Sequence, residues 1–202
     1  ISPKLSGEDF YFIQYLKKLG TVSQYNSVKI FPQARFSNRV NFGTGPAMIK
    51  GNGGDWKSYP FYNPLLFERI RASFLSFAEF FNNDIDFSLK QFLIQQTNKP
   101  LIWNQLRRNH KSRDRFVKAC EELVDGLRLL QFLKENHPQI SRGDEADLWE
   151  NLEHFASHDL DFGKSLKNLD NNQNIFKLEN MSLLRDEMVK FEDKLLINKP
   201  LL

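Results

Sequence analysis

The sequence predicts a mainly α-helical protein: a helical bundle of about six to eight helices with a small antiparallel β-hairpin or sheet insert near the N-terminus, an α+β arrangement. Two observations predict the helices. Apolar residues recur every three or four positions over most of residues 63–202, and capping residues or prolines stand where these stripes begin. A third observation predicts the insert, because residues 21–62 carry short β-branched and aromatic runs broken by Gly, Asn and Pro.

We expect a single domain over residues 1–202, with residues 63–202 as its helical core. A chain of 202 residues is long enough to bury such a core, and its 19 Phe residues supply apolar surface. A first helix is expected over about residues 7–19, because acidic residues follow Ser6, an apolar stripe runs through the segment, and Gly20 can end it.

The glycine-rich string within residues 43–54 is the most distinctive part of the insert. It holds half of the ten glycines, and its Asn52-Gly53 pair is typical of a hairpin turn. We therefore predict that residues 51–54 form an exposed turn between two antiparallel strands. The string lacks the glycine spacings of phosphate-binding loops, and we expect no cofactor there.

Beyond the insert every segment is predicted to be helical. Asn63 and Pro64 indicate the start of a helix with phenylalanines around much of its circumference, which suits the centre of the bundle. Further helices are expected over about residues 86–97, 100–109, 112–136, 144–157 and 181–196. The longest apolar stripes predict one connected buried cluster that includes five residues: Phe74, Phe77, Leu123, Leu127 and Trp149.

The cysteine content and the lengths of the apolar runs indicate in which cellular compartment the protein is expected. The single cysteine, Cys120, cannot form an internal disulfide and lies in an apolar stripe, which favours a buried thiol in a reducing, cytoplasmic setting. No run approaches the roughly 20 apolar residues that span a bilayer, so we expect no membrane partner. Secretion as a bacterial effector stays open as an alternative.

The two halves of the chain carry opposite charge. Residues 1–115 hold 17 basic and 8 acidic residues, a net charge of +9, whereas residues 116–202 hold 11 basic and 17 acidic residues, a net charge of −6. A basic half attracts anionic partners. The alternative is that the two halves neutralise each other within the fold.

The densest basic run is RRNHKSRDR, at residues 107–115. Guanidinium groups near helix ends suit phosphate oxygens, so the run predicts contact with nucleic acid. Aromatic residues between the cations of the insert could stack on unpaired bases. The candidate nucleic-acid-binding residues are Arg35, Arg39, Lys50, Trp56, Arg107, Arg108, Lys111, Arg113 and Arg115.

One candidate metal site remains further along the chain. Glu150, His154 and His158 follow one another at helical spacing and would share a face, as metal ligands can. The competing interpretation is a hydrated acidic helix end. No nucleophile and base can be paired from the sequence, so no catalytic residue is assigned and an enzyme is not favoured.

Three functions follow in order of preference. The first is a non-enzymatic nucleic-acid-binding module that contacts phosphates through its basic face, as part of a larger machine. The second is a helical protein-interaction domain, such as a regulatory or secreted effector subunit, which would use the heptad-spaced stripe of residues 181–195 to bind a protein partner. The third is a metal-dependent hydrolase built on Glu150, His154 and His158.

Overall fold

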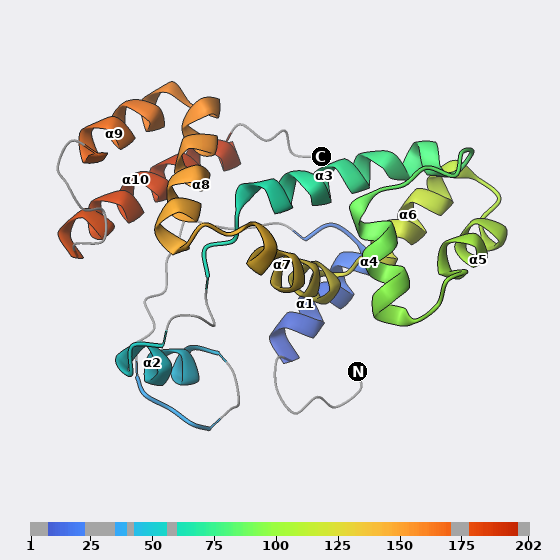
Figure 1. The fold of residues 1–202 in the computed structure, drawn as a ribbon, viewed down its shortest axis with the longest axis horizontal. Coiled ribbons are helices and arrows are strands. Elements are labelled where there is room, and N and C mark those ends of the chain that lie inside the picture. Colours follow the sequence, from blue (N-terminus) through green and yellow to red (C-terminus); the bar gives the residue numbers. More distant parts are fainter. Residues whose placement is uncertain (1–7, 23–34, 40–42, 56–59, 171–177, 198–202) are drawn as a thin grey trace. The chain divides into compact units, whose positions relative to one another are not determined.

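The computed structural model describes residues 8–22, 35–39, 43–55, 60–170 and 178–197, and it divides the chain into two compact units, Ile1–Ile140 and Ser141–Leu202 (Figure 1). The described residues are mainly helical, with ten helices, and they include no strand. The mainly α-helical class is therefore confirmed, with more helices than the six to eight predicted. Whether the whole chain is a single domain, as expected, stays a prediction.

Unit 1 contains seven of the described helices: α1 (Glu8–Leu19), α2 (Thr44–Asn52), α3 (Pro64–Phe80), α4 (Ser88–Thr97), α5 (Ile102–Asn109), α6 (Arg113–Leu123) and α7 (Gly126–Ile140). The long helix α3 packs against α4, α6 and α7, and α5 packs against α6. Unit 2 consists of α8 (Asp144–His158), α9 (Leu160–Asp170) and α10 (Leu178–Ile197), with α9 in contact with both of the other helices.

Helix α3 begins where the sequence indicated. The Asn63 side chain accepts a hydrogen bond from the backbone N–H of Leu65 at 3.0 Å, and Pro64 occupies the first turn, where its missing N–H has no cost. Further along, Ser73 ties α3 to the start of α4, because its hydroxyl donates to Arg69 O and accepts from the backbone N–H of Leu89. This buried hydroxyl is thus satisfied on both sides.

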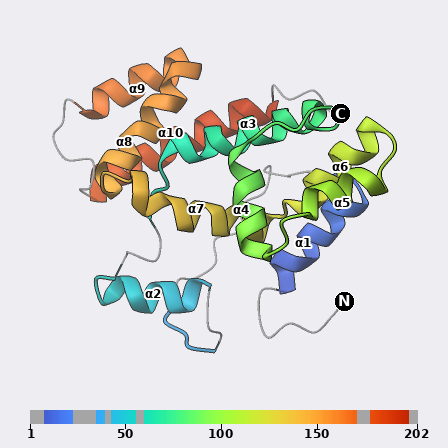
Figure 2. The same cartoon turned by 45° about the vertical axis from the view of Figure 1, so that its right-hand side comes forward.

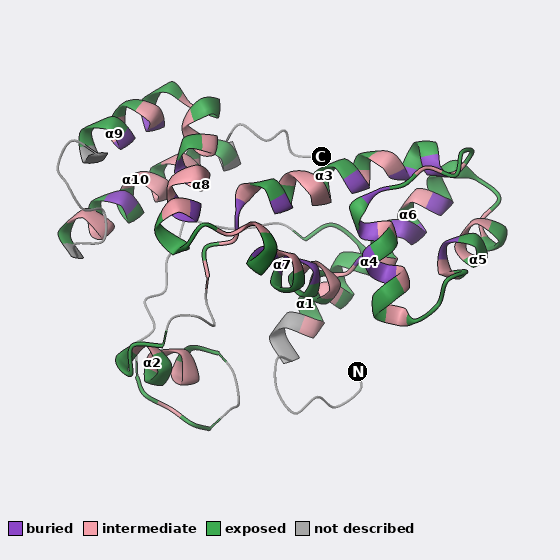
Figure 3. Cartoon of the chain, viewed as in Figure 1, coloured by how far each residue is buried: buried purple, intermediate pink, exposed green. Residues whose placement is uncertain are grey.

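Aromatic rings form the centre of unit 1, and Figure 3 shows the buried stretches on the facing sides of its helices. Phe77, Phe80, Phe87 and Trp103 lie with ring centroids 5.2–6.2 Å apart, at separations typical of stable aromatic pairs. Trp103 also donates its indole N–H to Lys90 O at 3.2 Å. This core therefore accounts for part of the abundance of phenylalanine.

The prediction of one connected core is wrong. Phe77 is fully buried, and Phe74 and Leu123 pack against the same cluster, but Trp149 packs in a separate cluster within unit 2. Leu127 is 37% exposed, because the expected helix over residues 112–136 is interrupted. Asp125 accepts a hydrogen bond from the backbone N–H of Arg128 at 3.0 Å and so starts a new helix, which changes the side on which Leu127 lies.

The hairpin predicted at residues 51–54 is also wrong, because Gly51 and Asn52 belong to helix α2. Residues Ala47–Lys50 are compatible with a helix, and Pro46 lies in its first turn, where a proline is tolerated. The Asn-Gly-Gly sequence ends this helix. Gly54 takes a positive φ of 79°, and the N–H of Asp55 returns to Lys50 O at 3.0 Å. The other strands expected in the insert fall largely outside the described residues.

Unit 2 is held by a core of its own, made of Leu148, Leu152, Phe162, Leu166 and Leu184. Met188 and Phe191 of α10 pack against this core, and the Phe191 ring stacks on Phe162 with centroids 5.2 Å apart. The heptad-spaced stripe of α10 is thus largely used inside unit 2.

Candidate nucleic-acid interface

The turn between α5 and α6 brings the basic run together. Helix α5 ends at Asn109, His110–Ser112 form the connection, and α6 begins at Arg113. The Ser112 hydroxyl accepts from the backbone N–H of Arg115 at 3.4 Å, as expected for a residue that caps a helix start. The two helices lie side by side in both views of unit 1 (Figures 1 and 2).

Cations surround this turn and are open to solvent. We define the basic edge as five exposed residues: Arg108, Lys111, Arg113, Arg115 and Lys118. Lys118 was not among the predicted residues, although it follows Arg115 at a spacing of three and so lies on the same side of α6. The carboxylate within this stretch is Asp114, whose side chain is 92% exposed. Its Oδ1 lies 3.8 Å from Arg113 Nε, and an exposed ion pair of this kind contributes little stability.

Arg107 does not lie on the exposed edge, although the sequence predicted it to be one of the nucleic-acid-binding residues. Its Nη2 donates to Phe80 O at 2.7 Å, and its guanidinium carbon lies 4.4 Å from the centroid of the Phe80 ring. Phe80 is the last residue of α3, so its carbonyl has no partner within that helix. Arg107 therefore secures the end of α3 by a hydrogen bond and a cation–π contact.

The positive charge of Arg107 also acts on an exposed carboxylate, Asp84. The pKa of Asp84 is lowered, chiefly by a hydrogen bond from Lys90 Nζ at 2.7 Å and, to a smaller extent, by Arg107. Lys90 Nζ lies 5.0 Å from the same Phe80 ring centroid. Arg107 and Lys90 thus both contact Phe80 at the end of α3. The other arginines and the lysine of the basic run face solvent.

Three candidate cations of the insert, Arg35, Arg39 and Lys50, are described by the structure and are exposed. Arg35 and Arg39 lie in a segment without regular secondary structure, and Lys50 lies in the last turn of α2. Trp56 lies outside the described residues. The convergence of these cations with the α5–α6 turn therefore stays a prediction.

The candidate metal ligands are engaged in other ways. Glu150 forms an ion pair with Arg142, and Nδ1 of His158 faces the backbone carbonyl of His154 at 2.8 Å. The two histidine rings lie 4.8 Å apart, centroid to centroid. Among the described residues no group of three His, Cys, Asp or Glu side chains is arranged to hold a metal ion.

Two buried residues of unit 1, His137 and Cys120, lie away from the predicted sites. The ring of the buried His137 packs edge-on against Tyr62, with centroids 5.3 Å apart, and burial raises the pKa of Tyr62. Cys120 is fully buried, and burial, with a smaller effect of Glu121, raises the pKa of its thiol to about 12. Both residues lie in the hydrophobic interior, and neither lies at the basic edge.

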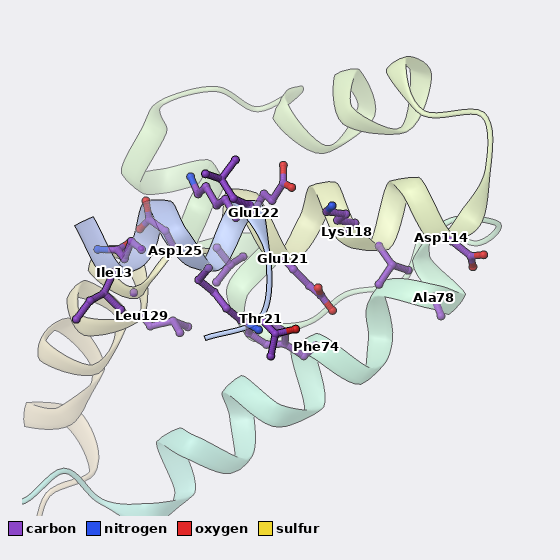
Figure 4. A pocket seen from close by; sticks show the side chains of 18 of the residues that line it. Ile13, Thr21, Phe74, Ala78, Asp114, Lys118, Glu121, Glu122, Asp125 and Leu129 are labelled. Atoms are coloured by element: carbon purple, nitrogen blue, oxygen red, sulfur yellow. The ribbon is translucent and has the colours of Figure 1, made fainter. Parts of the chain in front are cut away.

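A large pocket adjoins the basic edge within unit 1. It has a volume of about 1160 Å³, lies between α1 and the helices α3, α6 and α7, and is lined by Arg113 and Lys118 among others. Figure 4 shows Ile13, Asp125 and Leu129 toward one end of the pocket and Asp114 and Ala78 toward the other. The basic edge and the pocket thus share the exposed side of α6.

Comparison of the chain with known protein families, with curated proteins and with solved structures finds no match. In the portion of the chain that the structure describes, no helix is long and apolar enough to cross a membrane.

Proposed function

We propose that the protein is a non-enzymatic module that binds nucleic acid through phosphate contacts of the basic edge. The observation that supports this most is the exposure of five cations around one turn, with one carboxylate, Asp114, among them. Several cations within reach of successive phosphates are what a site that follows a nucleic-acid backbone needs.

The helix arrangement adds support. Two short helices joined by three residues have the connectivity of a helix-turn-helix motif, in which residues near the start of the second helix approach the nucleic acid. The start of α6 also carries the positive end of the helix dipole, which favours phosphate oxygens. Direct phosphate contact by Arg113 and Arg115 is therefore the core of the proposal.

Charge also favours unit 1 as the binding part. Its sequence holds 20 basic and 12 acidic residues, whereas that of unit 2 holds 8 basic and 13 acidic residues. The resulting net charges, +8 and −5, would attract a polyanion to unit 1 and repel it from unit 2.

A protein-interaction role through α10 has less support. Leu184 is buried in the core of unit 2, and Met188 and Phe191 pack against that core, so they are not available to a partner helix. Leu183 and Leu195, which are 53% and 50% exposed, remain as the apolar residues that a protein could contact.

Charge reversal tests the nucleic-acid proposal. We expect mobility shifts at low salt with single-stranded DNA, double-stranded DNA or RNA, and we expect the Lys111→Glu/Arg113→Glu double variant to lose them. The control variant, Lys134→Glu/Lys167→Glu, changes the charge equally at two exposed positions away from the turn and should still bind. Circular dichroism would verify that both variants stay helical. Binding that is lost equally in both variants, or is absent from the wild type, would contradict the proposal.

A further inference from the structure

The pocket and the basic edge share two cations. Arg113 and Lys118 belong to the basic edge, and both also line the pocket. A strand whose phosphates lie against these two side chains therefore has a cavity directly beside it. The volume of the pocket, about 1160 Å³, exceeds the roughly 300–1,000 Å³ usual for small-molecule sites, so a base and its sugar fit within it.

The pocket contains apolar surface on which the flat face of a base can pack. Phe74 of α3, Val117 of α6 and Leu129 of α7 line the pocket, and each is partly buried against the main core of unit 1. The fold therefore holds these side chains in position before any ligand binds. Proteins that take up unstacked bases contact them through aromatic and aliphatic side chains of this kind.

Among the described residues, the charges that line the pocket are balanced in number. They are the cations Lys17, Lys18, Arg113 and Lys118 and the carboxylates Asp114, Glu121, Glu122 and Asp125. These side chains add no net charge that would repel a strand. Along α6 the two cations lie toward the start of the helix, and three of the four carboxylates follow them. The pocket thus offers cations at one end of α6 and hydrogen-bond acceptors at the other.

Glu121 is the carboxylate that is best placed to receive a base. Asp125 already pairs with Arg128 at 3.0 Å, whereas the Glu121 carboxylate forms no ion pair or hydrogen bond with another described residue. Figure 4 shows the Glu121 side chain directed toward the part of the pocket where Phe74 lies. Glu121 follows Lys118 by three residues, a rise of about 4.5 Å along the helix. An acceptor therefore lies about one turn from a cation of the basic edge.

We propose that the pocket takes one unpaired base of a single strand bound at the basic edge, and that the amino group of this base donates to Glu121. Cytosine, adenine and guanine carry such an amino group, whereas uracil and thymine carry only carbonyl oxygens, which a carboxylate repels. A duplex can contact the basic edge, but its bases are paired and stacked and do not enter the pocket. The inference rests on the proposed function, because the basic edge must hold the strand.

Two single-stranded oligonucleotides of equal length test this inference, one of deoxycytidine and one of deoxyuridine, because they carry the same phosphates and differ in the amino group. By fluorescence anisotropy at one salt concentration, the deoxycytidine strand should bind about fivefold more tightly or better, the lower end of what a base-edge contact provides. Glu121→Gln should remove the preference, because an amide donates to the uracil oxygen as readily as it accepts from the amino group. The control Glu153→Gln removes one exposed carboxylate of unit 2 and should keep the preference.

The outcomes distinguish this inference from the proposed function. If neither oligonucleotide binds, the proposed function fails and the inference fails with it. If the wild type binds both equally tightly, the basic edge binds phosphates but the pocket does not select a base, and the inference alone is overturned. A preference for deoxycytidine that persists in Glu121→Gln also overturns it, because the base would then be recognised elsewhere. A preference lost in Glu121→Gln and kept in Glu153→Gln supports it.

Discussion

One arginine of the basic run stabilises the fold and is not available to bind a ligand. Arg107 and Arg108 are neighbours in sequence, but Arg107 holds the carbonyl and ring of Phe80, whereas Arg108 is exposed. The partner of Arg107 lies 27 positions earlier in the chain, so no local pattern could distinguish the two residues. Only the tertiary packing assigns them different roles.

This difference gives a paired prediction. We expect Arg107→Ala to lower the free energy of unfolding by about 1–3 kcal/mol, because it leaves the Phe80 carbonyl without its charged donor. The matched variant Arg108→Ala should change it by less than about 0.5 kcal/mol, as is usual for exposed side chains. Urea denaturation measures both. Equal losses would mean that the Arg107 contacts do not stabilise the fold.

Cys120 gives a second prediction at the level of one residue. Because the pKa of its thiol is raised to about 12, almost no thiolate exists at pH 8, and the sulfur is buried as well. A thiol reagent at pH 8 should therefore modify the folded protein far more slowly than the denatured protein. Comparable rates, followed by absorbance or mass, would contradict the buried position.

At the scale of elements, helix starts were predicted correctly where the residues at the boundary are typical of one kind of structure. The Asn63-Pro64 pair starts α3 as expected, and Ser112 caps α6 as expected. The Asn52-Gly53 pair was misread as a hairpin turn because glycines also end helices: Gly53 caps α2 with a φ of −82°, and the positive φ belongs to Gly54. The break at Asp125 was missed because the apolar spacing continues across it.

The part of the candidate site that could be predicted is the part formed by residues adjacent in sequence. The exposed cations Lys111, Arg113 and Arg115 cluster because they are adjacent in sequence and flank one turn. The pocket beside them could not be predicted, because it joins residues of α6 and α7 to residues of α1 and α3, which lie much earlier in the chain. The presence of two separate cores could not be predicted either, because the spacing of apolar residues along a helix does not show which other helices it contacts.

The start of α9 provides a prediction about an element. The Asp159 carboxylate accepts the backbone N–H groups of Asp161 and Phe162 through Oδ1 and pairs with Lys194 of α10 through Oδ2, at 2.7 Å. Asp159→Asn keeps an oxygen for the helix start and loses the ion pair, whereas Asp159→Ala loses both. We expect unit 2 to lose stability in both variants and more in the alanine variant, as measured by thermal unfolding. Equal losses would mean that the cap contributes nothing.

The same pair predicts a dependence on pH. The hydrogen bond from Lys194 lowers the pKa of Asp159 below its usual 3.8, so this contribution is present above pH 3.8 and is lost as the pH falls through the lowered pKa. The pKa of Lys194 is raised above 10.5, mainly by Asp159, so its contribution is lost only as the pH rises through that raised value. The stability difference between wild type and Asp159→Asn should therefore be constant at neutral pH and shrink below pH 3.8. A difference that does not change in acid would contradict the pairing.

At the scale of the whole molecule, two helical units with separate cores carry opposite net charge. Unit 1 combines the aromatic core, the basic edge and the pocket, and unit 2 forms a three-helix arrangement with an acidic sequence. We therefore propose that a polyanion binds to unit 1 alone and that Arg113 and Arg115 contact its phosphates directly.

The salt dependence of binding tests this claim most directly. Each phosphate contact on duplex DNA contributes about −0.9 to the slope of log K against log salt. We therefore predict that Arg113→Ala/Arg115→Ala reduces the magnitude of the slope by about 1.8, if each arginine makes one contact. The matched variant Lys134→Ala/Lys167→Ala should leave the wild-type slope unchanged. Identical slopes for the wild type and the Arg113→Ala/Arg115→Ala variant, measured by fluorescence anisotropy over a salt series, would contradict the account.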